Sequence, residues 1–419
     1  MGDISTLVLD VGSCSTRAGF AGDSLPGVVL PSFMGNASQP AAAAAAADDA
    51  DAAATPAAVR KHYLGLKELG MRRKDMDITP AMKDGLVSDW EVLEQIWGHV
   101  FLSELKVDPR NHPVLLTEPV LNTEAIREQM CQTIFESHHI PALFVAKSAV
   151  LTAFASGRST ALVFKSGNGC TTATPVLDGW AMQPQVKCLA SGGQQLSTKL
   201  LESLTASGET LRPRPAFAGG VELDVSGFRP SYREFWMGEL ANEIKGSGCI
   251  SFAEDAPAVA SFKMPDGKQV AISGDVSTGL VELGFSAAAT PMDEGTGAAP
   301  AGGSDGKYAQ LIAKAIKGAG LNVEQSKLLY GNVIVTGGNS LIPGFFERLQ
   351  GDTFRALNAE SAHLGSRLLM VAPSTAVERH YSAWIGGSIV GSLPCFPQMW
   401  ITAAEYAEQG PHVVNRKCP

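Results

Sequence analysis

The chain has 419 residues, more than one ordinary hydrophobic core holds, so two or more domains are expected. Its formal net charge of −9 argues against a general nucleic-acid binder or a membrane-surface protein, and no apolar run approaches the length of a transmembrane helix. Its seven scattered cysteines include no Cys-x-x-Cys pair, which argues against structural zinc and disulfides and indicates a reducing compartment; the N-terminus also lacks the pattern of a secretory signal.

Residues 7–23, LVLDVGSCSTRAGFAGD, predict a β-hairpin with a polar tip. A short apolar run, typical of a buried strand, ends at Asp10, and the small residues 12–16 form the turn. Such a tip can present backbone N–H groups, hydroxyls and the Arg17 cation to an anion, while Asp10 could hold the water shell of a metal ion. By itself, a Gly/Ser turn after a strand is more often only a turn.

A second stretch strengthens this hypothesis because it repeats the first. Residues 162–172 read LVFKSGNGCTT, with Gly167 at the place of Gly12 and Thr171 at the place of Thr16. Two such strand–turn units facing each other could clamp a polyphosphate from both sides. An internal duplication of this kind requires two domains with a cleft between them.

The chain between and after these hairpins alternates strands and helices. The Ala-rich residues 36–58 predict a mobile insertion without chemistry. Helices are expected over residues 91–105, 125–136 after Thr123, 148–155 capped by Ser148 and ending near Gly157, 195–204, 232–245, from Phe345 and from Tyr381; strands over 114–116, 143–145 and 333–335; a hairpin around 265–267; and a loop over 287–306. Trp384 and Trp400 are expected in the core or a groove.

Several long stretches, in order along the chain, resemble actin. They are DVGSCSTRAGFAGD (10–23), IWGHVFLSELKVDPRNHPVLLTEP (96–119), AVLTAFASGRST (149–160), TGGNSLIPGF (336–345), and ERHYSAWIGGSIVGSL (378–393) through QMWI to the final RKCP. The resemblance covers nearly the whole chain and is weakest over 36–80 and 205–306. With KDGLVSDWE (83–91) and its divergent middle, the chain is most similar to the actin-related protein four branch, whose members are nuclear subunits of chromatin-remodelling and histone-acetyltransferase complexes.

The resemblance implies an α/β, actin-like fold: duplicated RNase H-like domains, with four subdomains around a central nucleotide cleft. Residues 1–155 would form the first half (subdomains 1 and 2), 156–374 the second half (subdomains 3 and 4), and 375–419 a C-terminal segment that returns to the first half. The hairpin tips become phosphate loops. The implied ATP-binding residues are Asp10, Gly12, Ser13, Cys14, Arg17, Lys165, Ser166, Gly167, Asn168, Gly169, and, on the adenosine side, Gly337, Gly338 and His380.

The first departures from the actin pattern lie where the resemblance implies a magnesium ion. Arg17 takes the place of a lysine, Lys165 that of the second loop's aspartate beside the metal, and Asn168 that of the next aspartate. Lys165 reverses a charge where a magnesium water shell would lie, so no metal site is predicted and magnesium is doubtful. Lys165 could instead neutralise a phosphate directly. The alternative is a lost nucleotide site with Lys165 solvated.

The hydrolytic groups depart further. Ser148 and Thr172 stand where actin orients its attacking water with a glutamine and a histidine. Neither hydroxyl accepts a proton readily near neutral pH, so no catalytic residue is assigned, and hydrolysis is expected to be absent or very slow. His380 replaces a lysine, which predicts a pH-dependent contact.

A binding surface is implied as well. Actin receives partner helices in a hydrophobic cleft, and the matching positions are apolar or small: Phe154, Gly179, Trp180, Ile385, Ile389, Val390, Leu393 and Met399. Ordinary core packing is the alternative for Ile385 and Ile389. The implied partners are actin and a helix of a remodelling ATPase or acetyltransferase scaffold, with histones or nucleosomes reached through the complex, and without membrane contact or strong direct nucleic-acid binding.

Three functions compete at this point: a nuclear interaction subunit that pairs with actin, a filament-forming cytoskeletal ATPase, and a small-molecule kinase on the same duplicated fold. Lys165, Ser148 and Thr172 favour the first over the second. The insertion at 36–58 lies where actin makes filament contacts, so actin-style polymerisation is not expected. The actin-like C-terminal tail argues against the kinase.

Overall fold

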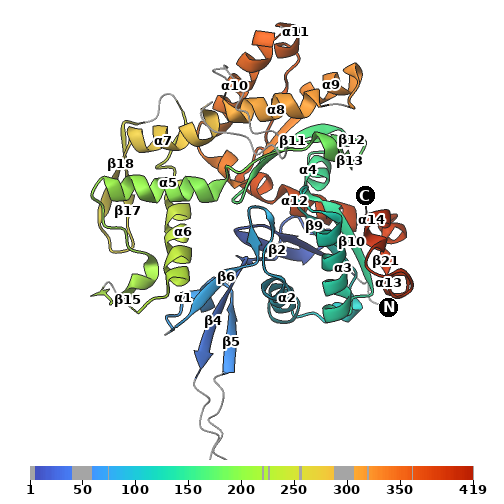
Figure 1. Ribbon diagram of the computed structural model, residues 1–419, viewed down its shortest axis with the longest axis horizontal. Helices are drawn as coiled ribbons and strands as arrows, with labels where there is room; N and C mark the ends of the chain where they lie inside the picture. The colour runs from blue at the N-terminus through green and yellow to red at the C-terminus, as the bar shows by residue number, and fades with distance from the viewer. Residues whose placement is uncertain are drawn as a thin grey trace, which may run out of the picture.

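The computed structural model describes residues 5–39, 59–73, 75–218, 221–224, 227–253, 257–286, 306–318, 320–360 and 362–418 (Figure 1). It confirms the α/β class, since two mixed sheets form its centre and helices pack around them. Within these ranges, no helix is both long and apolar enough to cross a membrane.

The first sheet begins with the predicted N-terminal hairpin. Its strands, in spatial order, are β21 (Ile401–Thr402), β10 (Ala142–Lys147), β9 (Val114–Glu118), β1 (Leu7–Val11), β2 (Ser15–Phe20) and β3 (Val28–Pro31). β1 and β2 are antiparallel, while β9 lies parallel to both β1 and β10. The apolar runs of β1, β9 and β10 are buried, as expected for strands covered on both faces.

The second sheet repeats this arrangement. Its strands, in order, are β13 (Trp180–Ala181), β12 (Thr171–Leu177), β11 (Ala161–Ser166), β19 (Val333–Thr336) and β20 (Met370–Val371), with β14 (Lys187–Leu189) also on β12. β11 and β12 form an antiparallel hairpin, and β19 lies parallel to β11 and β20. The duplication predicted from two short sequence stretches therefore extends to the order and direction of five strands in each sheet.

Two helices lie between the sheets, α4 (Ser148–Ala155) and α12 (Ala376–Gly391), and they pack against each other (Figure 1). Ser148 is the first helical residue of α4, after the N-cap residue Lys147, so the predicted Ser148 cap is wrong. α12 begins before Tyr381 because Thr375 and Glu378 form a capping box. Tyr381 itself has non-helical torsion angles, φ −112° and ψ 16°, at a kink inside the helix.

Small residues let α12 approach its neighbours closely. A Cβ atom added to Gly386 would overlap the backbone carbonyl oxygen of Leu151 in α4, and one added to Gly387 would lie 2.8 Å from the Val8 side chain. Trp384 is fully buried, as predicted, and its indole N–H donates a hydrogen bond to the Val8 carbonyl oxygen at 3.1 Å.

The other predicted elements are largely confirmed. Helices occur at α2 (Trp90–His99), α3 (Glu124–His138) with its Thr123 cap, α5 (Gly193–Ala206), α6 (Pro230–Gly246) and α10 (Phe345–Glu360), and the predicted hairpin is β17 (Val259–Lys263) with β18 (Gln269–Ser273). Another boundary was wrong: residues 36–39 belong to strand β4 (Phe33–Gln39), which pairs with β5 (Val59–Leu64) and β6 (Asp77–Pro80). The rest of the predicted insertion, 40–58, and most of the predicted loop, 287–305, lie outside the described residues.

The small sheet β4–β5–β6 packs against the N-terminal half of α6, and we call this contact the clasp (Figure 1). Tyr232, Phe235 and Trp236 of α6 are buried there against residues of the sheet and its neighbourhood: Ala37, Tyr63 and Ile78 in the sheet, and Leu69 and Met76 beside it. The Phe33 and Phe235 rings lie 4.9 Å apart between centroids. The Ile78 backbone N–H also donates to the Ser231 hydroxyl at 3.1 Å. The clasp thus joins the two halves of the molecule on the side away from α4 and α12.

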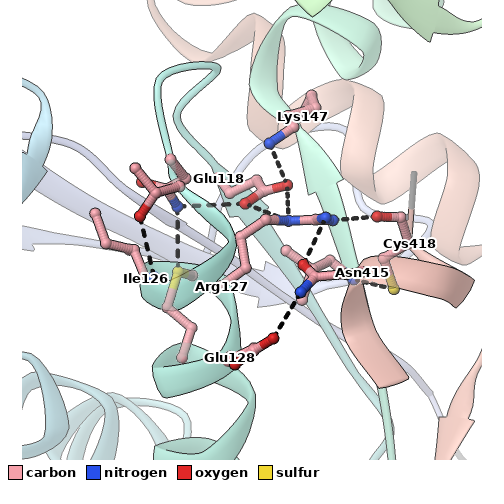
Figure 2. A network of polar contacts seen from close by, with 11 residues as sticks. Glu118, Ile126, Arg127, Glu128, Lys147, Asn415 and Cys418 are labelled. Atoms are coloured by element: carbon pink, nitrogen blue, oxygen red, sulfur yellow. Dashed lines mark hydrogen bonds and ion pairs between the residues drawn. The ribbon is translucent and has the colours of Figure 1, made fainter. Parts of the chain in front are cut away.

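A buried ionic network fixes the C-terminal tail to the first sheet (Figure 2). Glu118 at the end of β9 receives Arg127 of α3 at 3.0 Å and Lys147 of β10 at 2.9 Å, and the Glu118 side chain has no exposed surface. Arg127 also donates to the Asn415 side chain at 3.2 Å and to the Cys418 carbonyl oxygen. One arginine therefore connects a strand, a helix and the end of the chain.

Candidate functional site

A pocket of about 670 Å³ opens between the two sheets and is lined by residues of both halves. Its volume is within the usual range for small-molecule sites. The predicted residues that line it are Asp10, Gly12, Ser13, Cys14, Arg17, Lys165, Gly167, Asn168, Gly169, Gly337, Gly338 and His380, together with Ser148 and Thr172. The structure therefore brings together two hairpins that are about 150 residues apart in the sequence.

The first hairpin holds its charged residues in a fixed arrangement. Asp10 and Arg17 are cross-strand partners, and Arg17 Nη1 lies 2.8 Å from Asp10 Oδ2. Arg17 Nη2 donates to the Ser15 hydroxyl at 3.0 Å, and the Thr117 hydroxyl donates to Asp10 Oδ1. The Gly12 N–H closes the turn on the Ser15 carbonyl oxygen at 3.0 Å. Both oxygens of Asp10 are therefore occupied by protein donors.

The second hairpin has the same turn with different charges. The Gly167 N–H donates to the Cys170 carbonyl oxygen at 3.0 Å, just as the Gly12 N–H donates to the Ser15 carbonyl oxygen in the first hairpin. Lys165 is the cross-strand partner of Thr172, as Asp10 is of Arg17. The duplication thus places the Lys165 ammonium at the position equivalent to the Asp10 carboxylate.

The Lys165 ammonium and the Asp10 carboxylate act on each other electrostatically in the pocket. Burial alone would raise the pKa of Asp10, but the charges of Arg17 and Lys165, together with the Thr117 hydrogen bond, outweigh burial and hold this pKa below its usual range. Asp10 is therefore a carboxylate at any pH near neutrality. It is an anion that is already neutralised by the protein's own cations.

Glycines let the loops close around the pocket. A Cβ atom added to Gly169 would lie 2.6 Å from the Gly85 backbone nitrogen and 2.8 Å from the Ser13 hydroxyl, so the tips of the two hairpins meet at this point. Gly337 has φ +95°, and a Cβ atom there would overlap the Ser166 carbonyl oxygen. Only glycine suits such a position.

Ser166 is the exception among the predicted nucleotide-binding residues. Its side chain is buried, and its hydroxyl bonds to the Thr171 hydroxyl at 3.0 Å and accepts a hydrogen bond from Asn339 at 3.1 Å. Asn339 also donates to the Gly167 carbonyl oxygen at 2.9 Å. Ser166 thus holds the second hairpin to the turn after β19 and does not line the pocket.

Helix α6 supplies pocket residues that the sequence reasoning missed: Glu239, Asn242 and Lys245. Lys245 Nζ donates to the Gly193 carbonyl oxygen at 2.8 Å, and burial lowers the pKa of Lys245 to about 8, although Cys14 and Glu239 act in the opposite direction. The available signal was the three-residue spacing of these polar side chains, which places them on one face of a helix.

His380 of α12 lies beside Gly338, whose added Cβ atom would be 3.5 Å from the imidazole ring. Burial and then the Arg17 charge lower the pKa of His380 to about 4. The ring is therefore neutral at pH 7, and the pH dependence predicted for this contact falls in the acid range.

The predicted partner-helix residues divide into two groups. Trp180, Ile389, Leu393 and Met399 are 57%, 42%, 45% and 43% exposed, which rules out full core burial for Ile389. Phe154, Gly179 and Ile385 are half-buried. Val390 is buried in the core of the first half, so its assignment to an open groove was wrong.

Packing contacts bring the elements that carry Phe154, Trp180 and Ile389 together. A Cβ atom added to Gly179 would lie 3.1 Å from the Phe154 ring, which places β13 and its Trp180 next to α4. α4 in turn packs against α12, the helix that carries Ile389. We call Phe154, Trp180, Ile389, Leu393 and Met399 the apolar groove.

Comparisons with known proteins indicate the same family over the full length of the chain. Residues 1–419 match the family model described as Actin. The curated proteins named "Actin-related protein 4" from Oryza sativa subsp. indica and subsp. japonica are each 35% identical to this chain over 447 aligned residues, covering 100% of this chain and 99% of the relative. The Arabidopsis thaliana protein of the same name is 35% identical over 454 residues with the same coverage.

Proposed function

The chain belongs to the actin family and is similar over its whole length to proteins named actin-related protein 4, and from that premise we propose that it is a nuclear interaction subunit of chromatin-remodelling and histone-acetyltransferase complexes. In this proposal it pairs with actin on a helix of the ATPase or scaffold subunit, and histones or nucleosomes are reached through the complex. It does not act as a filament-forming ATPase.

The apolar groove is the observation that carries this proposal. Single exposed apolar side chains are common on soluble proteins. Here four large ones, Trp180, Ile389, Leu393 and Met399, are exposed at positions that the actin resemblance assigns to one partner surface, as expected of a surface that binds a partner. Trp180 lies on β13 and Ile389 on α12, and the side chains of this set are large and apolar. These features suit the apolar face of an amphipathic helix.

Recovery of the tagged full-length protein from nuclear extract, followed by mass spectrometry, tests this proposal. We expect actin together with a remodelling ATPase or an acetyltransferase scaffold. Trp180→Asp or Ile389→Asp should weaken recovery at least about thirtyfold, because each places a charge in the contact. Val323→Asp is the matched control, since Val323 is 70% exposed on α9 (Val323–Tyr330), outside the groove.

The circular-dichroism spectrum and melting temperature of each variant should equal those of the parent, because the side chains changed are exposed. Complex retained by both groove variants would contradict the groove as the docking site. Recovery of the protein alone, or as a homopolymer, would favour the filament-forming ATPase.

We further propose that the pocket binds ATP without turning it over. The pocket has the volume for a nucleotide, and Arg17, Lys165 and Lys245 supply positive charge around it. Two of its carboxylates are paired with cations, Asp10 with Arg17 and Glu118 with Arg127 and Lys147, and the third, Glu239, accepts a hydrogen bond from Asn242. Ser148 and Thr172 are poor proton acceptors.

Phosphate release from ATP by the purified full-length chain should therefore equal the buffer background. A general base typically contributes about 10²–10⁴-fold to such a reaction, and Ser148 and Thr172 supply none at the positions where actin orients its attacking water. Turnover above background that disappears in the Asp10→Ala variant would show that the pocket is catalytic and would contradict this prediction.

A further inference from the structure

We propose that the Lys165 ammonium takes the place of a divalent cation in the pocket, so that ATP binds as the metal-free polyphosphate and Mg²⁺ weakens its binding. This inference rests on the proposed assignment of the pocket to a nucleotide. It concerns the chemical form of the ligand, and it does not depend on the partner groove.

The first step is that Asp10, the carboxylate of the first hairpin, is already engaged by protein donors. Mg²⁺ prefers carboxylate and water oxygens and commonly uses one or two carboxylates together with substrate phosphates. Asp10 Oδ2 already receives Arg17 at 2.8 Å, and Oδ1 receives the Thr117 hydroxyl. Over the described ranges, no group of three or more His, Cys, Asp or Glu side chains is placed to hold a metal ion.

The second step is the position of Lys165. It lines the pocket, and its charge is close enough to Asp10 to lower the pKa of that carboxyl group. In the part of the chain that the structure describes, the Lys165 ammonium has neither an ion pair nor a hydrogen bond of its own. A half-buried ammonium without a fixed partner is available to an anion and repels a second cation.

The third step is the charge balance of the hairpins. In the first hairpin, Arg17 and Asp10 neutralise each other. In the second, Lys165 stands opposite the neutral Thr172, so this hairpin contributes one uncompensated positive charge. The backbone N–H groups of both glycine-containing turns favour an anion as well. Free ATP brings more negative charge to this arrangement than its magnesium complex does.

Calorimetric titration of the full-length chain with ATP, once in excess EDTA and once in Mg²⁺ above the ATP concentration, tests the inference. We expect the dissociation constant to rise about tenfold or more with Mg²⁺, as loss of one charge-assisted contact predicts. Mg²⁺ without nucleotide should release no heat above dilution. Binding that is equal in both buffers, or tighter with Mg²⁺, would overturn the inference.

Variants at one position separate the possible causes. Lys165→Asp should reverse the preference, so that ATP binds more tightly with Mg²⁺ than in EDTA. Lys165→Met should weaken ATP binding in EDTA and abolish the difference between the two buffers. Because methionine has a side chain of similar length to lysine, this variant also serves as the test if Lys165→Asp fails to fold. Lys199→Asp is the control for charge reversal, because Lys199 is exposed on α5 outside the pocket.

The outcomes also separate this inference from the proposed function. If the parent protein binds no ATP in either buffer, the nucleotide assignment and the role of Lys165 are both overturned, while recovery of the chromatin complex through the groove stands on its own test. If a Lys165→Met protein that folds retains the full effect of Mg²⁺, Lys165 is not the cation responsible.

Discussion

Replacement of Arg127 by methionine should lower the free energy of unfolding by about 3–5 kcal/mol, because it leaves the buried Glu118 carboxylate with only one cation. Glu118 has no exposed surface, and the Arg127 side chain is 8% exposed. Methionine keeps the apolar stem, so the change removes the guanidinium and little packing. Urea denaturation followed by circular dichroism measures the difference.

Arg110→Met is the matched control, since Arg110 pairs with Asp108 at 2.7 Å on an exposed surface. An exposed pair of this kind contributes little, so the control should unfold at the same urea concentration as the parent. A second readout is the tail: loss of Arg127 removes donors to Asn415 and Cys418, so limited proteolysis should cut the C-terminus sooner. Equal urea midpoints for Arg127→Met and the parent would contradict the prediction.

Replacement of Gly386 by alanine should cost about 3 kcal/mol, although alanine normally favours a helix. Its Cβ atom would overlap the Leu151 carbonyl oxygen, and backbone cannot yield as a flexible side chain can. The variant must push α12 away from α4, and these two helices connect the sheets. Thermal and urea unfolding of the purified variant measure the cost.

The matched control is Gly238→Ala in the interior of α6, where an added Cβ atom meets nothing within 4 Å. This variant should be more stable than the parent by about 0.5–1 kcal/mol, since glycine within a helix loses more chain entropy than alanine. The two substitutions are chemically identical and should have opposite signs. A stabilising Gly386→Ala would mean that the two helices are less tightly packed than the structure indicates.

Local signals in the sequence predicted the two hairpins and most helices. The turns at Gly12 and Gly167 are specified by the residues within them, and the buried runs of β1 and β11 are continuous in the sequence. The N-terminus of α3 was predictable because Thr123 is adjacent to the helix that it caps. These features depend on neighbours in the chain and not on the fold.

Features that depend on distant parts of the chain were missed. Residues 36–39 have no strong strand pattern and become strand because β5 and β6 pair with β4. Lys245 enters the pocket because the second half of α6 lines it; the spacing of Glu239, Asn242 and Lys245 shows that they share a helix face, but not what this face meets. Val390 appears equivalent to Ile389 in the sequence, yet only the orientation of α12 decides which of the two is buried.

The clasp also bears on the rate at which the two halves of the molecule can separate. The first half of α6 packs against the small sheet β4–β5–β6, and its second half lines the pocket. An opening between the halves wide enough to pass a nucleotide therefore parts aromatic rings that are buried against Tyr63 and Ile78. We therefore expect residues of the clasp, none of which lines the pocket, to slow the release of a bound ligand and so to lengthen its residence time.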